Sequence, residues 1–261
     1  MANKHLLRRV FRYLGWFAII LLGMLSGPIG VLSLGNLDMT THWRDASLAS
    51  TGTAPRPEEF NEPLIQVYGA RAYHWRGAFA IHTWIATKRT AADHYSVYQV
   101  IGWNLYRGHS AVSVRRQGPP DFLWFNARPD LLLERRGDGV EALIDRIEEA
   151  VQNYPYGHEY RVWPGPNSNT FTAYVAREVP ELGLDLPPTA IGKDYLPGNR
   201  IIDRMPSGTG WQFSLYGLLG LGVARSEGLE FNLLGLSAGI DVDDLALRLP
   251  GIGRVDLVPP G

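Results

Sequence analysis

A long uncharged stretch stands near the beginning of the chain. No residue between Arg12 and Asp38 carries a charge, so positions 13–37 form an uncharged, largely apolar run of 25 residues. At about 1.5 Å per residue, a helix of this length measures about 37 Å, more than the roughly 30 Å of a bilayer's hydrocarbon core. Tyr13 and Trp16 lie at one end of the run, where an aromatic belt falls. The pattern predicts a transmembrane helix over 13–37.

A cleaved signal peptide is the alternative interpretation of this segment. Ser33 and Gly35 would serve as a small-residue cleavage pair, and Arg8-Arg9-Val10-Phe11 weakly resembles a twin-arginine export signal. The apolar run is longer than the usual apolar region of a signal peptide, which favours a retained anchor.

The distribution of charge predicts the orientation of the anchor. Residues 1–37 carry +4 and the remaining residues carry −5, because four basic residues precede the first acidic one: Lys4, Arg8, Arg9 and Arg12. A basic flank stays in the cytoplasm. We therefore expect a single-pass protein of a bacterial inner membrane, with 1–12 in the cytoplasm, the bilayer as partner of 13–37, and the main domain in the periplasm.

Two strands are expected after a linker. Residues 38–63 lack periodicity and are rich in Thr, Ser, Ala, Pro and Glu, which is typical of a linker. Residues 78–87 are largely apolar at both odd and even positions, as in a central strand that is buried on both faces. Residues 95–103 are β-branched and aromatic, which predicts the next strand. The polar segment 88–94 between them predicts a hairpin loop.

Two helices are predicted after these strands. The first covers 137–154, with Asp138 and Glu141 as a capping box and Pro155 at its end. Its apolar stripe has helical spacing: Val140, Leu143, Ile144, Ile147 and Val151. The second helix is expected from near Ser168 to Glu178.

The end of the chain is predicted to be β. Residues 211–223 are apolar at most odd positions, and 228–242 show a similar pattern that changes parity near Leu233-Leu234, which predicts a bulge. Ser226-Glu227-Gly228 would form the turn of a C-terminal β-hairpin in a β-rich extension, 201–261.

Composition excludes several classes of protein. A hydrophobic content of 45% excludes a disordered chain, and a net charge of −1 argues against a nucleic-acid partner. The absence of Cys excludes disulfides, thiolate metal sites and a cysteine nucleophile. His74, His82 and His94 would be the candidate metal ligands, but no HExxH or carboxylate-bracketed pattern accompanies them. We therefore predict no metal and no cofactor.

Ser168 and His82 are the candidates for chemistry. The segment Asn167–Phe171 follows a turn constrained by Pro and Gly, which places Ser168 at a helix N-terminus. Unpaired N–H groups there can stabilise an oxyanion beside a nucleophile, although Ser and Asn are also the preferred helix caps. His82 lies in an apolar strand, where it is either a core residue with partners for both ring nitrogens or a catalytic base.

Together these segments resemble the circularly permuted papain-like families, which include the lecithin:retinol acyltransferase relatives and the desumoylating isopeptidases. In those families a Cys attacks an acyl carbon, a His is its base, and a third polar residue orients the His. The resemblance implies an α+β fold over 64–200, an antiparallel sheet with packed helices. It places Ser168 at the nucleophile, His82 at the base, and His94 or Gln99 at the orienting position.

The resemblance also implies an oxyanion site made by Asn167 or Asn169 and the N–H groups of the helix. Ser replaces the family's Cys, and because a hydroxyl is far less acidic it depends more on its base. If Lys88 paired with Asp93, the numbers of paired residues would sum to 181 and His82 would face Gln99.

Two further segments resemble the signatures of a bacterial family known only as domain of unknown function 3750, which has an N-terminal anchor. They are Gly165–Phe171 and Ile191–Tyr195. Lys193 in the second segment is expected in a surface turn, although it is also an alternative base for Ser168.

Two functions are therefore expected. One is a membrane-anchored serine hydrolase or acyltransferase acting on amide or ester bonds of the cell envelope. The other is a catalytically inactive papain-like module that binds an envelope ligand or a protein partner. A sealed cleft at Ser168 would favour the second.

Overall fold

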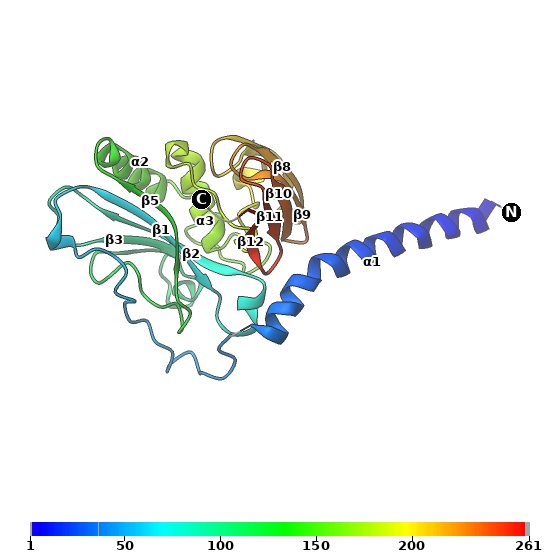
Figure 1. Cartoon of the computed structure of the whole chain (residues 1–261), viewed down its shortest axis with the longest axis horizontal. Coiled ribbons are helices and arrows are strands. Elements are labelled where there is room, and N and C mark those ends of the chain that lie inside the picture. Colours follow the sequence, from blue (N-terminus) through cyan, green and yellow to red (C-terminus); the bar gives the residue numbers. More distant parts are fainter. Residues whose placement is uncertain (1, 36, 259–261) are drawn as a thin grey trace.

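The computed structural model describes residues 2–35 and 37–258, which form a projecting helix, an α+β body and a second sheet (Figure 1). The projecting helix, α1 (Ala2–Leu34), contains Pro28. Its segment His5–Leu34 is long and apolar enough to cross a membrane, so the predicted apolar helix is present but begins earlier and ends earlier than 13–37.

The C-terminal third of α1 packs on the body. Met24 is buried in one cluster with Leu233 and Leu236 of the second sheet. Gly27 faces Pro250 so closely that a Cβ atom added there would overlap the Pro250 carbonyl oxygen. The end of α1 is therefore part of the folded body.

The first sheet has five antiparallel strands in the order β4-β3-β2-β1-β5. Its strands are β1 (Leu64–Arg71), β2 (Ile81–Lys88), β3 (Ser96–Val100), β4 (Val112–Arg115) and β5 (Asp130–Arg136). The two predicted strands correspond to β2 and β3, but β3 ends at Val100 and Trp103 lies in a short 3₁₀ helix. Five such 3₁₀ helices occur in the described residues: Pro57–Glu59, His74–Ala78, Gly102–Arg107, Pro180–Leu182 and Pro197–Asn199.

The two faces of this sheet carry separate cores. Two helices, α2 (Val140–Gln152) and α3 (Ser168–Glu178), pack on the face that buries Ile65 and Ile85. The other face buries an aromatic cluster that includes Tyr68, Trp84, Phe122 and Trp124.

The segment predicted as a linker lies along the aromatic face of the body. Asp121 accepts hydrogen bonds from Ser50 Oγ at 2.7 Å and from the Ala54 backbone N–H at 3.1 Å. Ser50 also forms a β-bridge with Phe122. Residues 38–63 are therefore held against the domain by polar contacts.

The helices agree with the sequence pattern except at one end. α3 has the predicted bounds, and its cap is Asn167. α2 begins at Val140 after Gly139, whose backbone is left-handed, and it has no side-chain cap. The predicted capping box is wrong because Glu141 instead accepts hydrogen bonds from Arg89 Nη1 and the Thr90 backbone N–H.

The second sheet corrects the predicted C-terminal hairpin. It is an antiparallel meander of seven strands in the order β12-β11-β10-β9-β8-β7-β6. They are β6 (Ile202–Arg204), β7 (Gly210–Leu215), β8 (Leu219–Ala224), β9 (Gly228–Leu233), β10 (Leu236–Asp241), β11 (Ala246–Leu249) and β12 (Gly253–Asp256).

Tight turns explain this difference. Tyr216 and Gly217 have φ values of 52° and 70°, and Leu234 and Gly235 have 53° and 82°. Two residues with positive φ make the two-residue hairpin turn, which reverses the chain. The parity change near Leu233-Leu234 is therefore a turn between β9 and β10, and the predicted bulge is wrong.

Candidate functional site

The N-terminus of α3 is closed by its own side chains. Asn167 Oδ1 accepts hydrogen bonds from the backbone N–H groups of Asn169 at 2.9 Å and Thr170 at 3.1 Å. Thr170 Oγ1 in turn accepts the Asn167 N–H at 3.1 Å, which completes a capping box. Two N–H groups that an oxyanion would need are therefore already occupied.

Asn169 ties α3 to the neighbouring segments. Its Nδ2 donates to the carbonyl oxygens of Ile81 at 2.9 Å and Ile191 at 2.8 Å. Its Oδ1 accepts from Thr83 Oγ1 at 3.0 Å. All of these partners belong to the protein itself, so Asn169 performs a structural role here.

Ser168 lies in the first turn of α3, after the cap, and is only 3% exposed. In the part of the chain that the structure describes, its hydroxyl takes part in no hydrogen bond. Its carbonyl oxygen is 3.4 Å from Thr83 Oγ1 on β2. The structure thus gives Ser168 no base.

His82 lies on the opposite face of the first sheet from Ser168. Successive side chains of a strand point to opposite faces, and Thr83 of β2 is the neighbour that contacts α3. His82 points the other way and stacks on Trp124 with ring centroids 3.6 Å apart and planes 2° from parallel. The sheet itself therefore separates the predicted nucleophile from the predicted base.

Gln99 is the only predicted orienting residue that reaches His82. His82 Nε2 lies 2.9 Å from Gln99 Oε1, which places the ring proton on Nε2. The pairing of Ile85 with Tyr98 puts Gln99 diagonally across from His82 on the same face, and the paired numbers sum to 183 rather than 181. Burial, only partly opposed by this hydrogen bond, lowers the pKa of His82 to about 4, so the ring is neutral at pH 7.

His94 lies away from the other candidates. It is in the exposed loop after β2, where its Nδ1 is 2.7 Å from Asp93 Oδ1. Because His82 is near the start of β2 and the loop follows its end at Lys88, six residue steps of about 3.3 Å put roughly 20 Å between them. The structure therefore does not bring His94 together with His82.

The aromatic face reaches the surface at Trp103. Trp103 is stacked with Trp124, with ring centroids 5.8 Å apart, and Trp124 also stacks with His82. Phe125 meets both indoles edge-on. Trp103 is 43% exposed. The aromatic cluster thus reaches the surface at a half-exposed indole.

Lys193 lies in a buried network of charges, which the sequence analysis missed. It is 1% exposed and forms an ion pair with Glu230 of β9, so the predicted surface turn is wrong. Arg248 of β11 donates to Glu230 at 2.7 Å and makes two bonds to Asp185 at 2.6 and 2.7 Å. Burial alone would lower the pKa of Lys193, but the carboxylates of Asp194 and Glu230 outweigh it and hold that pKa above its usual value.

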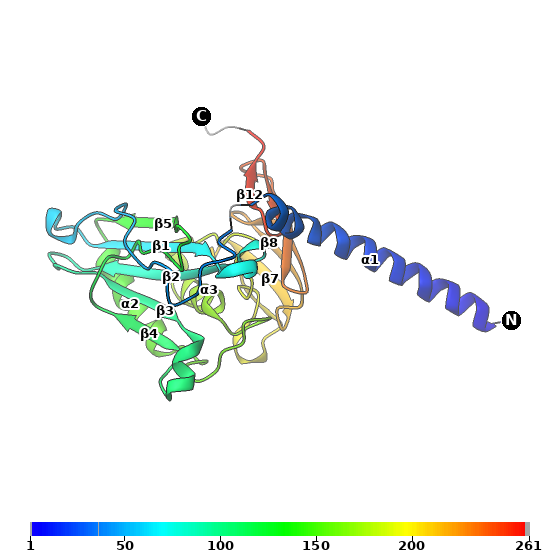
Figure 2. The same ribbon diagram turned by 90° about the horizontal axis from the view of Figure 1, so that it is seen from below.

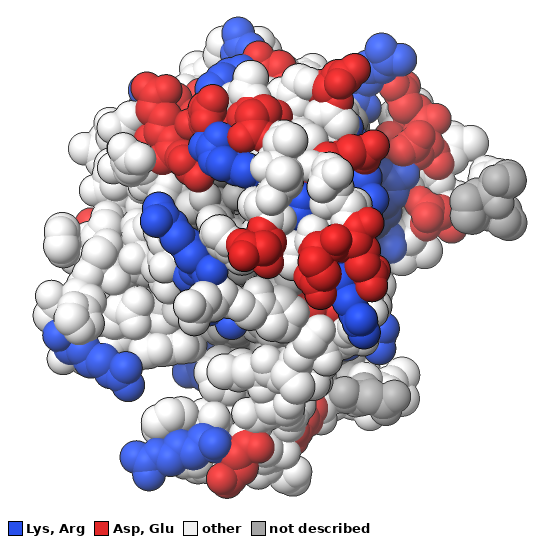
Figure 3. Space-filling view, turned by 90° about the vertical axis from the view of Figure 1, so that its left-hand side faces the viewer, with Lys and Arg blue, Asp and Glu red and all other residues white. Residues whose placement is uncertain are grey.

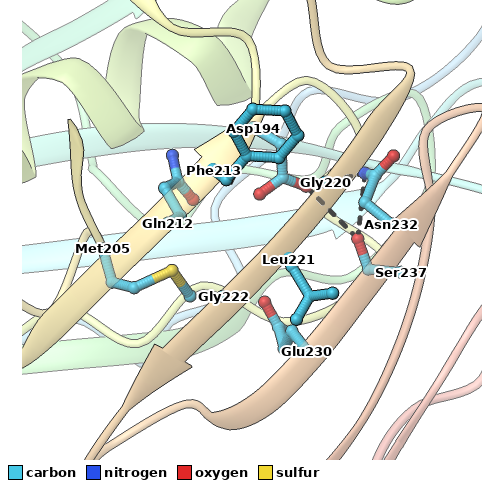
Figure 4. A pocket seen from close by; sticks show the side chains of 10 residues that line it. All are labelled: Asp194, Met205, Gln212, Phe213, Gly220, Leu221, Gly222, Glu230, Asn232 and Ser237. Atoms are coloured by element: carbon cyan, nitrogen blue, oxygen red, sulfur yellow. Dashed lines mark hydrogen bonds between the residues drawn. The ribbon is translucent and has the colours of Figure 1, made fainter. Parts of the chain in front are cut away.

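Asp194 borders a small cavity beside this network (Figure 4). Its carboxylate accepts hydrogen bonds from Asn232 Nδ2 at 2.8 Å and Ser237 Oγ at 3.3 Å. The cavity has a volume of about 10 Å³, which is about what one water molecule needs. The signal in the sequence was the polar residue at every second position of apolar strands, such as Glu230 and Asn232.

No group of three or more metal-ligating side chains comes together among the residues that the structure describes. Most groups of the charged network have partners within the protein: Arg177 Nη2 donates to the Lys193 carbonyl at 2.7 Å, and Arg248 Nη2 donates to that of Leu186 at 2.7 Å. The buried Nη1 of Arg177 has no hydrogen-bond partner among the described residues. The arrangement fixes the second sheet to the body.

Comparison with known proteins identifies the family. The model of the family described as "Protein of unknown function (DUF3750)" matches residues 62–195, which is 134 of the 261 residues, and the chain belongs to this family. The matched range contains the first sheet, α2, α3 and Lys193, whereas the second sheet lies outside it. No curated protein and no solved structure matches the chain significantly.

Proposed function

We propose that this protein is a membrane-anchored, non-catalytic binding module of the bacterial cell envelope. The observation that carries the proposal is the position of Ser168 and His82 on opposite faces of one sheet. A general base must come within hydrogen-bond reach of its nucleophile. Rotation of a side chain cannot bring His82 through the sheet to Ser168.

The N-terminus of α3 supports the same conclusion. An oxyanion site needs N–H groups that point at the reacting atom and have no other partner. Asn167 occupies the N–H groups of Asn169 and Thr170, and the amide of Asn169 is itself bonded to Ile81 and Ile191. In this proposal the papain-like resemblance concerns the packing of α3 against an antiparallel sheet, without the catalytic residues.

In this proposal α1 crosses the inner membrane and is retained. Met24 and Gly27 pack against the second sheet and Pro250, so cleavage near Ser33 and Gly35 would remove part of the core. The basic residues before position 13 keep that end in the cytoplasm, which places the body in the periplasm.

The ligand of the module is an envelope component or a protein partner. The aromatic stack favours the surface around Trp103, because a half-exposed indole held by its neighbours offers apolar contact with little loss of side-chain entropy on binding.

A fluorophosphonate probe tests the proposal. The full chain in detergent is treated with the probe beside an active serine hydrolase as positive control, and labelled peptides are identified by mass spectrometry. We expect no more label on the wild type than on Ser168→Ala. Labelling of Ser168 that disappears in His82→Ala would overturn the proposal.

A further inference from the structure

The second sheet has an apolar outer face. Cross-strand pairing places Trp211, Val223, Leu229 and Ile240 side by side in one row across β7, β8, β9 and β10. Each of these four side chains is more than half exposed. A row of large apolar side chains open to water is unusual, and contiguous patches of this kind mark interaction sites.

The inner face of the same sheet is polar. Alternate residues of β7 and β9, such as Gln212, Glu230 and Asn232, are buried against the body, as is Arg248 of β11. An antiparallel sheet in water normally turns its apolar face to the core and its polar face to solvent. This sheet has the reverse arrangement, so the environment of its outer face is expected to be apolar.

The outer face continues into the packing of α1. Two rows further along the same face, Leu219 pairs with Leu233 and Leu233 with Leu236, and the last two bury Met24 of α1. Figure 1 shows β8, β9 and β10 on the side of the body from which α1 projects, and the turned view in Figure 2 places β7 and β8 on that side too. The opposite side carries acidic and basic side chains interspersed over its upper part (Figure 3).

The length of α1 decides how deep this face lies. From Arg12 to Met24 the helix rises only about 18 Å, whereas a hydrocarbon core is about 30 Å thick. Even when counted from Arg8, the rise to Met24 is about 24 Å. Tilt of the helix shortens these distances across the membrane. If the basic residues mark one boundary, the hydrocarbon therefore extends past Met24, to the level where α1 meets the sheet.

We propose that the outer face of the second sheet is seated in the hydrocarbon of the bilayer leaflet from which the body emerges. This inference rests on the proposed retention of α1 as an anchor. The interior strands meet the requirement for paired backbone groups in lipid, since each is hydrogen-bonded on both sides. On the edge strand β6, Arg204 pairs with Trp211 of the outer face, and its guanidinium suits the headgroup region. The domain thus binds lipid through two elements, a spanning helix and a sheet face.

The absence of native Cys allows a direct test of depth. The full chain carrying Leu221→Cys, on the outer face, is labelled with bimane and reconstituted in phosphatidylcholine–phosphatidylglycerol vesicles that contain doxyl-labelled lipid. Glu149→Cys, exposed on α2 away from α1, is the matched control. We expect severalfold stronger quenching by the doxyl lipid at Leu221→Cys than at Glu149→Cys, and Val223→Cys should repeat the result.

The contrary outcomes are distinguishable. Equal quenching at Leu221→Cys and Glu149→Cys would overturn the inference, and so would a label shielded from aqueous iodide without lipid quenching, because a second copy or a protein partner would then cover the face. A label at Leu14→Cys in α1 reports the anchor separately. Quenching there but not at Leu221→Cys refutes only the sheet, whereas no quenching at Leu14→Cys refutes the anchor.

Discussion

His82 is held in its neutral form by burial between Trp124 and Gln99. Its pKa is lowered from 6.5 to about 4. An unfolded chain takes up this proton near pH 6.5, whereas the folded chain does so only near pH 4. Within that window the unfolded state binds more protons, so the free energy of unfolding falls as the pH falls.

The expected size of this effect follows from the two pKa values. The neutral ring contributes its full stability above pH 6.5, and the contribution is lost progressively towards pH 4, by about 3 kcal/mol in total. His82→Phe keeps an aromatic ring against Trp124 but removes the titrating group. It also leaves Gln99 without its partner, which lowers stability by roughly 1–3 kcal/mol at every pH.

Urea unfolding of the full chain in detergent, followed by tryptophan fluorescence between pH 7.5 and pH 4.5, measures this directly. Over this pH range, the free energy of unfolding of the wild type should fall further than that of His82→Phe. The difference should be most of the total of about 3 kcal/mol. His94→Ala is the matched control, because it removes a histidine from the exposed loop without touching the surroundings of His82. A change of slope that both variants share does not come from His82. An unchanged slope in His82→Phe would refute the buried, neutral state of His82.

Substitutions at three further places in the fold test the packing. Glu230→Gln should lower the free energy of unfolding in urea by about 3–5 kcal/mol, because Lys193 stays buried without its main partner. The double variant Glu230→Leu with Lys193→Met should lose less stability. Equal losses in the two variants would contradict the pairing of Glu230 with Lys193. Gly27→Leu should lower the midpoint of thermal unfolding, because Pro250 fills the space beside Gly27. Gly23→Leu is the control and should leave the midpoint unchanged, because Gly23 has open space around it. Equal midpoints for the two variants would contradict the docking of α1. Asn167→Ala should cost about 1–2 kcal/mol in urea through loss of the cap, and no loss would mean that the cap is dispensable.

The hydrophobic pattern predicted β2 and β3 of the first sheet and both helices packed on it, but it missed β1, β4 and β5. The apolar residues at both odd and even positions of β2, and the Pro and Gly residues that flank α3, are local signals. Both elements occur in the structure with nearly the expected bounds. The second sheet was predicted as one hairpin because Tyr216-Gly217 and Leu234-Gly235 lack the Asn-Gly or Asp-Gly sequence of a typical tight turn.

The candidate site depended on information that no local pattern holds. Whether His82 or Thr83 faces α3 is decided by which face of the sheet the helix covers, and a change of one residue reverses the answer. The alternation of polar and apolar residues in β9 places Glu230 and Leu229 on opposite faces of the sheet. It does not show which of the two faces is buried. The usual rule places the apolar side inside, and here the charged partners Lys193 and Arg248 bury the polar side.

Retention of α1 is the claim on which both the anchored module and the bilayer-seated sheet depend. The most direct measurement is the intact mass of the protein extracted from bacterial membranes after an alkaline carbonate wash. We expect the washed membranes to hold the chain with residues 1–35 still attached. A shorter chain that begins near residue 36 and leaves the membranes in the wash would contradict both proposals.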